Sequence, residues 1–180
     1  NDIVSLKAGG GRLVGDCLLT AAFLSYAGAL SADYRAAVLA IDVADVEARK
    51  LPFTSPARVE ALLVTDAIVQ GWNSDGLPAD ENSVQNGILT TSASRFPLCI
   101  DPQTQANRWI KNMEKDNKLV ICKMSDEGGG GSGNNLVRNL ENAIRIGLPL
   151  LIESLGEEMD PVLEPVLTKT LVRKGGETMM

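Results

Sequence analysis

The first half of the chain is patterned for helices. Between residues 12 and 29, apolar residues recur at three- and four-residue spacing, which predicts a largely buried helix ending near Gly28. Ser31 is a candidate N-cap for a second helix over residues 32–49. Shorter helices are also expected, over residues 56–64 with Pro56 at its first position, over 66–72, and over 84–89 with Ser83 as its cap. Residues 1–11 carry little pattern, and the Gly9–Gly11 run predicts a flexible joint.

The pattern changes at Pro97, where strand and helix signals begin to alternate. Strands are predicted at 97–100, 118–124 and 149–152, and helices at 104–114 and 134–146, with Gly147 as a C-cap. This alternation implies a parallel sheet with right-handed crossovers. A short broken helix should follow at 160–167, and the low-complexity run Gly128–Gly133 should be mobile.

Composition narrows the possible partners and chemistry. The 180 residues are 44% hydrophobic and 22% charged, as in an ordinary globular protein, and the net charge of −6 argues against a nucleic-acid partner. The chain has no His, which removes the usual general base and commonest metal ligand. The apolar stretch 14–30 is interrupted by Asp16, so no membrane partner is expected. The cysteines lack metal spacing and are expected to be small buried hydrophobes: Cys17, Cys99 and Cys122.

The strand–turn–helix stretch RFPLCIDPQTQANRWIK has the outline of a phosphate-binding loop without its chemistry. A working loop reads GxxxxGK[ST], but its fixed positions are held by Asp101, Ala106, Asn107 and Arg108. The Asp101 carboxylate would repel phosphate, and Pro102 lacks a backbone N–H. The two interpretations are a plain strand-to-helix turn, with Asp101 capping the helix, and a weak nucleotide site that uses Arg108.

An acidic group follows the third predicted strand. In nucleotide hydrolases an acidic pair at such a strand end holds Mg²⁺ and polarises water. Here Glu153 is followed by Ser154, so the pair is broken. Glu153 therefore has two possible roles, either as a metal ligand or general base, or as a solvated or ion-paired carboxylate. Asp160 belongs to the same acidic group, and Glu157 and Glu158 suit the start of a helix.

Candidate chemistry is otherwise sparse. No nucleophile–base pair stands out, because Ser–His and Cys–His arrangements are impossible in this chain. Trp72 and Trp109 are expected to pack in a core or an interface.

Several blocks of the chain together resemble one family, the dynein heavy chains. They are LVGDCLLTAAFLSYAGAL with Tyr34-Arg35, Trp72 with GLPADENSVQNGI, RFPLCIDPQTQANRWIKNMEKDN, and LENAIRIGLPLLIESLGEEMDPVLEPVL. The IDPQxQAN…WIK block is similar to ciliary, or axonemal, dyneins in particular. The resemblance covers most of residues 12–167, from the base of the coiled-coil stalk into the fifth AAA+ module of the motor ring.

This resemblance implies a fold and a set of site residues. The fold class expected is α/β, a partial AAA+ (P-loop-NTPase-like) three-layer αβα parallel sheet preceded by a helical segment. Residues 1–72 would be the helical segment following the stalk, and 73–180 the N-terminal part of a truncated degenerate AAA+ module. The sheet would then be incomplete, because the third predicted strand, at 149–152, would lack its neighbours. The resemblance places a lost Walker B strand at residues 150–154, including Glu153 and Ser154. It places a lost phosphate loop at Asp101, Pro102, Gln103, Thr104, Gln105, Ala106, Asn107 and Arg108.

The function that the resemblance implies is mechanical. The segment would be a non-catalytic part of an ATP-driven microtubule motor ring that couples ring conformational change to the stalk, without a catalytic residue, metal or cofactor of its own. ATP and Mg²⁺ would bind other modules. Partners would be the neighbouring AAA+ modules, the stalk and its buttress, and microtubules through the parent motor, in the cytoplasmic cytoskeleton of a cilium or flagellum. Two alternatives are a divergent ATPase module with weak ATP binding through Arg108 and Glu153, and a stand-alone adaptor binding a protein through the helical front.

Overall fold

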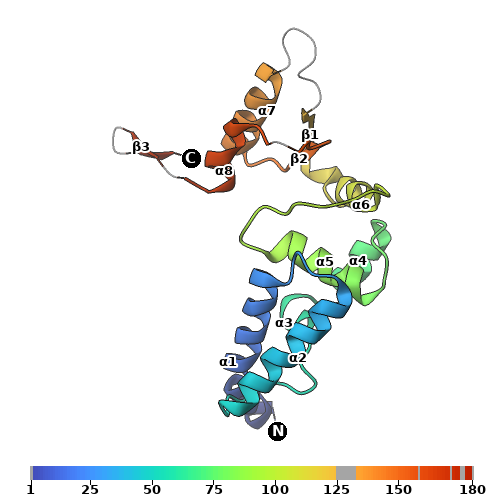
Figure 1. Cartoon of the computed structure of the whole chain (residues 1–180), viewed down its shortest axis with the longest axis vertical. Helices are drawn as coiled ribbons and strands as arrows, with labels where there is room; N and C mark the ends of the chain where they lie inside the picture. Colours follow the sequence, from blue (N-terminus) through green and yellow to red (C-terminus); the bar gives the residue numbers. More distant parts are fainter. Residues whose placement is uncertain (1, 125–132, 158, 171, 175–176, 180) are drawn as a thin grey trace. The chain divides into compact units, whose positions relative to one another are not determined.

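The computed structural model describes residues 2–124, 133–157, 159–170, 172–174 and 177–179 (Figure 1). The chain divides into two compact units, residues 1–106 and 107–180. The expected mobile run Gly128–Gly133 lies outside the described residues except for Gly133.

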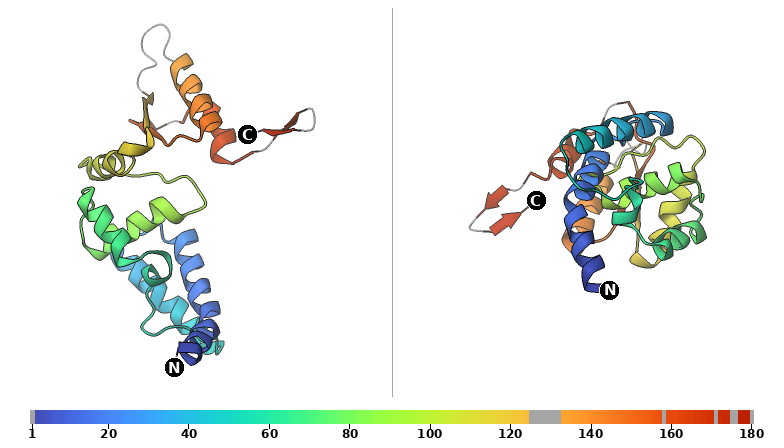
Figure 2. Two further views of the ribbon diagram at one scale, coloured as in Figure 1. Left: turned by 180° about the vertical axis from the view of Figure 1, so that it is seen from behind. Right: turned by 90° about the horizontal axis from the view of Figure 1, so that it is seen from below.

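The first unit is built from helices, as Figure 2 shows from two further directions. Two long helices, α1 (Asp2–Tyr26) and α2 (Ala32–Ala48), contact each other, and α1 also contacts the short α3 (Glu60–Leu63). The remaining helices of this unit are α4 (Asp66–Ser74) and α5 (Glu81–Ser92), and α5 packs on α3. The helices predicted from periodicity are therefore confirmed. The expectation that residues 12–29 form a largely buried helix is wrong, because Leu13, Val14, Leu18 and Tyr26 of α1 are exposed.

Several local predictions about the helices of this unit are wrong or only partly right. The flexible joint at Gly9–Gly11 is wrong, because α1 runs unbroken from Asp2. Helical glycine costs about 1 kcal/mol, and the helix tolerates this because its later turns are anchored by buried Leu19 and Phe23. The helix expected at 56–64 is reduced to Glu60–Leu63. Two residues before the predicted start at Pro56, the Thr54 N–H and hydroxyl both donate to the Asp16 carboxylate at 2.7 Å. These bonds tie this part of the chain to α1 in a non-helical conformation.

The caps of α2 and α5 also differ from expectation. Ser31 occupies the N-cap position of α2, but its side chain makes no capping hydrogen bond. Ser83 does not cap α5. The cap is Asp80, whose carboxylate accepts from the Ser83 N–H at 3.0 Å and from the Ser83 hydroxyl at 2.7 Å. A carboxylate accepts two such bonds at once, so the helix begins at Glu81, three residues earlier than predicted.

A buried arginine joins three helices of the first unit. Arg35 of α2 is only 6% exposed, and its guanidinium donates to the carbonyl oxygen of Ala27 at 3.1 Å and to Asn86 Oδ1 of α5 at 2.8 Å. It also lies 6.0 Å from the centre of the Phe23 ring. Around it, an apolar cluster of Phe23, Ala27 and Val59 forms the core of this unit.

The second unit contains a strand–helix–strand crossover. Strand β1 (Val120–Lys123) pairs in parallel with β2 (Leu150–Glu153), in the register Val120↔Leu150 to Lys123↔Glu153. Helix α7 (Gly133–Ile146) connects them and packs on β1. Gly147 ends the helix with a φ of +76°, a conformation that glycine adopts without strain. The predicted parallel pair, its crossover helix and the glycine cap are confirmed.

The rest of this unit consists of short elements. The predicted broken helix appears as a 3₁₀ turn, Pro161–Leu163, followed by α8 (Glu164–Leu167). A second 3₁₀ turn lies at Lys115–Asn117. Strands β3 (Val172–Lys174) and β4 (Glu177–Met179) form an antiparallel pair that the sequence did not predict.

The predicted strand at 97–100 is wrong. Residues 95–100, all described, are neither helix nor strand, and the side chains of Leu98 and Ile100 are 68% and 93% exposed. An apolar run becomes a strand only when a neighbouring strand takes its backbone N–H and C=O groups. In the described residues β1 and β2 pair with each other, and neither pairs with this run.

The prediction that both tryptophans are buried is confirmed, and the prediction that all three cysteines are buried is wrong. Trp72 and Trp109 are both buried, at 7% and 2% exposure. Of the cysteines, Cys122 is buried as expected, whereas Cys17 and Cys99 are exposed. Cys17 lies on α1, and Cys99 lies in the unpaired run described above.

Candidate functional site

The turn that precedes α6 (Gln105–Met113) is closed by its own carboxylate. The Thr104 N–H donates to the Asp101 carbonyl oxygen at 3.2 Å, and the Gln105 N–H donates to Asp101 Oδ1 at 2.8 Å. Asp101 therefore caps α6, in agreement with one of the two interpretations of the sequence. The first N–H groups of a helix are the donors that a bound phosphate would use. At Gln105 that donor already bonds to a negatively charged group of the chain.

The backbone of this turn is also unusual. Thr104 has a φ of +56°, in the left-handed region. A β-branched residue rarely adopts this conformation, whereas a nucleotide loop places glycine where the chain must turn tightly around phosphate. Pro102 and Gln103 complete the turn, and both are exposed. The loop thus keeps a sharp turn without the glycines that would let phosphate approach its backbone.

Two side chains of α6 contact the carboxylate at the end of β2. Asn107 Nδ2 and Lys111 Nζ each lie 2.6 Å from Glu153 Oε1. The side chain of Glu153 is 13% exposed and that of Lys111 is 37% exposed. We refer to Asn107, Lys111 and Glu153 as the Glu153 cluster. Both donors lie on one face of α6, because residues four apart in a helix are neighbours.

This cluster determines the charge state of Glu153. Hydrogen bonds from Lys111 and then Asn107 lower the pKa of the Glu153 carboxyl below its ordinary value of 4.5, with a smaller contribution from the positive charge of Lys123 on β1. The carboxylate is therefore ionised at neutral pH and already paired with an internal cation. A carboxylate held in this way is poorly suited to act as a general base, which works best with a pKa near the operating pH.

The other predicted site residues are not drawn into this cluster. Ser154 follows the strand with a φ of +55° and is exposed. Arg108 is exposed on α6, and Ala106 is half-buried. Asp160 caps the 3₁₀ turn by accepting from the Val162 N–H at 2.9 Å, as suits an acidic residue at a helix start. Glu157 is exposed, and Glu158 lies outside the described residues.

No group of three or more Cys, Asp or Glu residues that could hold a metal ion occurs among the described residues. Likewise, no helix in the described part is long and apolar enough to cross a membrane.

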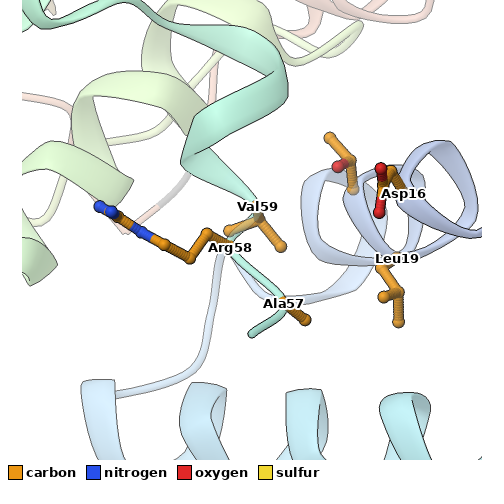
Figure 3. Close-up of a pocket in the computed structure, with 6 residues that line it drawn as sticks. Asp16, Leu19, Ala57, Arg58 and Val59 are labelled. Carbon is orange, nitrogen blue, oxygen red and sulfur yellow. The ribbon is translucent and has the colours of Figure 1, made fainter. Parts of the chain in front are cut away.

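Two hollows in the first unit contain none of the predicted site residues. One, of about 10 Å³, lies between α1 and residues 57–59 (Figure 3) and has room for about one water molecule. The Arg58 side chain is directed away from Asp16 and Leu19 in this view. The other, of about 310 Å³, is an open groove between α1 and α2 that is lined mainly by apolar side chains.

Sequence reasoning missed Lys111 and Arg35 as organising residues. A signal for Lys111 was present, since Asn107 and Lys111 stand at i and i+4 on a strongly amphipathic helix. Their partner at Glu153 is 46 residues from Asn107, and no local pattern indicates such a pairing. For Arg35 the sequence gives no local signal, and its role follows from its hydrogen bonds to Ala27 and Asn86.

The fold and the comparisons with known proteins agree on a class. A parallel β–α–β unit preceded by helices is the arrangement expected of a partial AAA+ α/β domain. The family model described as the ATP-binding dynein motor region matches residues 70–180. The chain belongs to this dynein motor family.

Individual relatives are axonemal and flagellar heavy chains. The chain is 49% identical over 177 residues to the Dynein-1-alpha heavy chain of the flagellar inner arm I1 complex of Chlamydomonas reinhardtii, covering 98% of this chain and 4% of that protein. It is 45% identical over 172 residues to Dynein axonemal heavy chain 10 of Homo sapiens, covering 95% of this chain and 4% of that protein. It is 44% identical over 165 residues to Dynein axonemal heavy chain 5 of Mus musculus, covering 91% of this chain and 3% of that protein. The chain thus spans only a few per cent of the length of these relatives.

Proposed function

We propose that this chain is a non-catalytic part of an ATP-driven microtubule motor, working in a cilium or flagellum. It would pass conformational change between nucleotide-hydrolysing modules and the stalk. Family membership and the likeness to axonemal and flagellar heavy chains support the motor assignment. Residues 1–72 would act as the helical segment after the stalk, and 73–180 as the start of a degenerate AAA+ module.

One observation carries the non-catalytic part of the proposal. The chain satisfies the key groups of the site internally: Asp101 takes the Gln105 N–H, and Lys111 pairs with Glu153. A phosphate loop needs free N–H donors and a lysine for phosphate, and a hydrolase needs a strand-end carboxylate that is available to a metal or water. We therefore expect neither a nucleotide nor Mg²⁺ as a resident cofactor of this segment.

A second candidate is weak nucleotide binding. It is favoured by the description of the matching family as ATP-binding and by the exposed Arg108 on α6. An exposed guanidinium attracts anions without the geometry that a phosphate loop supplies.

Titration with a fluorescent ATP analogue and Mg²⁺ separates the two candidates. The proposal predicts no saturable signal in the micromolar range, for either the 180-residue chain or its Arg108→Ala variant. Micromolar affinity that is abolished by Arg108→Ala would instead establish the nucleotide-binding module. An Arg138→Ala variant, altered at an exposed arginine of α7, controls for loss of positive charge alone.

A further inference from the structure

The Glu153 cluster joins elements that are far apart in sequence. Glu153 is the last residue of β2, and its partners come from two successive turns of α6. Both donors converge on the same oxygen, Oε1, at 2.6 Å. Bonds between an ionised acceptor and a charged donor at such distances are the stronger kind of hydrogen bond.

The opposite side of α6 is anchored as well. Trp109, between Asn107 and Lys111 in sequence, is 2% exposed. Burial of its large ring fixes the helix through apolar contact, whereas the cluster fixes it through charge. A helix held on two faces has little freedom to rotate about its own axis.

The cation in this cluster is part of the polypeptide. In a nucleotide hydrolase, a carboxylate at a strand end binds a metal ion. It loses that positively charged partner whenever the metal and its nucleotide leave. A lysine ammonium neutralises the same charge but stays attached to the chain, and it neither polarises water as a metal ion does nor bridges to phosphate. The contact between α6 and β2 therefore needs no ligand.

We propose that Lys111 is a positioning residue, a tethered cation that, with Asn107, locks α6 to the end of β2 in the absence of any nucleotide. The inference rests on the proposed function and gives it a physical basis. With the lock closed, β1, β2 and α6 move as one body, so that displacement at one end of this unit reaches the other without a nucleotide cycle.

Hydrogen–deuterium exchange of the 180-residue chain tests this lock. Lys111→Met should raise exchange at the amides of residues 108–112 and 150–153 by about five-fold, since the lock contributes only to local opening. Lys111→Arg, which keeps a charged donor, should restore most of the protection. Lys115→Met, altered at an exposed lysine outside the cluster, should leave these amides unchanged.

A double variant guards against a merely structural effect of the Met side chain. In a Glu153→Gln background, Lys111→Met should add less than about a two-fold change, because the partner charge is already gone. Full additivity of the two changes would overturn the proposal. So would equal exchange in Lys111→Met and Lys115→Met, or acceleration spread evenly over both units.

Adding Mg²⁺ and ATP to the wild-type chain separates this proposal from the function on which it rests. Protection of residues 103–107 by ATP would contradict the non-catalytic function. The lock would still stand if Lys111→Met loosened the same amides.

Discussion

At the scale of single residues, two helical glycines of the first unit make opposite predictions. A Cβ added at Gly87 of α5 would lie 3.0 Å from two ring carbons of Trp72 and 3.1 Å from Leu77 Cδ2. These neighbours are themselves buried and cannot move away freely. A Cβ added at Gly71 of α4 would meet nothing within 4 Å.

Gly87→Ala should therefore lower the free energy of unfolding by about 1–3 kcal/mol through overpacking. Gly71→Ala, the matched control, should raise it by up to about 1 kcal/mol because alanine is the better helix former. Urea unfolding followed by circular dichroism measures both. Equal effects of the two substitutions would show that Trp72 does not pack on Gly87 as described.

Residue-scale prediction from sequence succeeded where the cause is local. The Asp101 cap and the Gly147 cap follow from backbone geometry at a helix end, and both are found. The cap of α5 was misplaced because Asp80 and Ser83 are both good N-cap residues, and sequence alone does not rank them. The two site positions with positive φ, Thr104 and Ser154, carry no sequence signal for that conformation.

At the scale of elements, Arg35 ties α1, α2 and α5 together. Arg35→Met keeps the length of the side chain but removes the guanidinium donor to Asn86 Oδ1 and to the Ala27 carbonyl oxygen, which still accepts from the Leu30 N–H at 3.0 Å. We expect the free energy of unfolding to fall by about 1–3 kcal/mol, the usual cost of losing hydrogen bonds to a charged group. Arg12→Met, at an exposed position on α1, should change it by less than about 0.5 kcal/mol. A loss below about 1 kcal/mol for Arg35→Met in urea unfolding would contradict this role.

The contact between α6 and β2 predicts a pH dependence. Lys111 and Asn107 of α6, with Lys123 of β1, lower the pKa of Glu153 in the folded state. The stabilisation is therefore complete above the unfolded-state pKa and is lost as the pH falls through the lower, folded-state pKa. Glu153→Gln should remove roughly 1 kcal/mol at pH 7 and progressively less in acid.

The measurement is urea unfolding at a series of pH values from 7 downward. Asp80 also has a lowered pKa, because Ser83 donates to it, so the wild-type slope contains more than one group. The difference between wild type and Glu153→Gln isolates the cluster. Glu141→Gln, at an exposed position on α7, should keep the wild-type slope. A constant difference at all pH values would rule out the charged pairing.

Element-scale prediction depended on whether each element finds its partner within the chain. The pattern at 118–124 and 149–152 predicted two strands, and both are found, paired with each other. The equally apolar run at 97–100 has no pairing strand among the described residues and stays exposed. The Glu153 cluster was missed for a related reason, since a contact across 46 residues requires the crossover to be placed first.

At the scale of the whole molecule, the segment is short beside the proteins that it resembles. The relatives are heavy chains of which the segment matches only 3% or 4%. Its described part contains a helical unit and a β–α–β unit, in which the Gln105 N–H and the Glu153 carboxylate are bonded to other groups of the chain. Under the proposed function, a module whose geometry needs no exchangeable ligand would transmit displacement within the motor.

The central claim is that this module stays empty while others in the motor bind ATP. Electron cryo-microscopy of the complete heavy chain with saturating Mg²⁺ and a non-hydrolysable ATP analogue tests it directly. We expect nucleotide density in other modules, none against the amides of residues 103–107, and unbroken density between Lys111 and Glu153. A nucleotide seated against those amides, with Glu153 turned toward a metal ion, would contradict the claim.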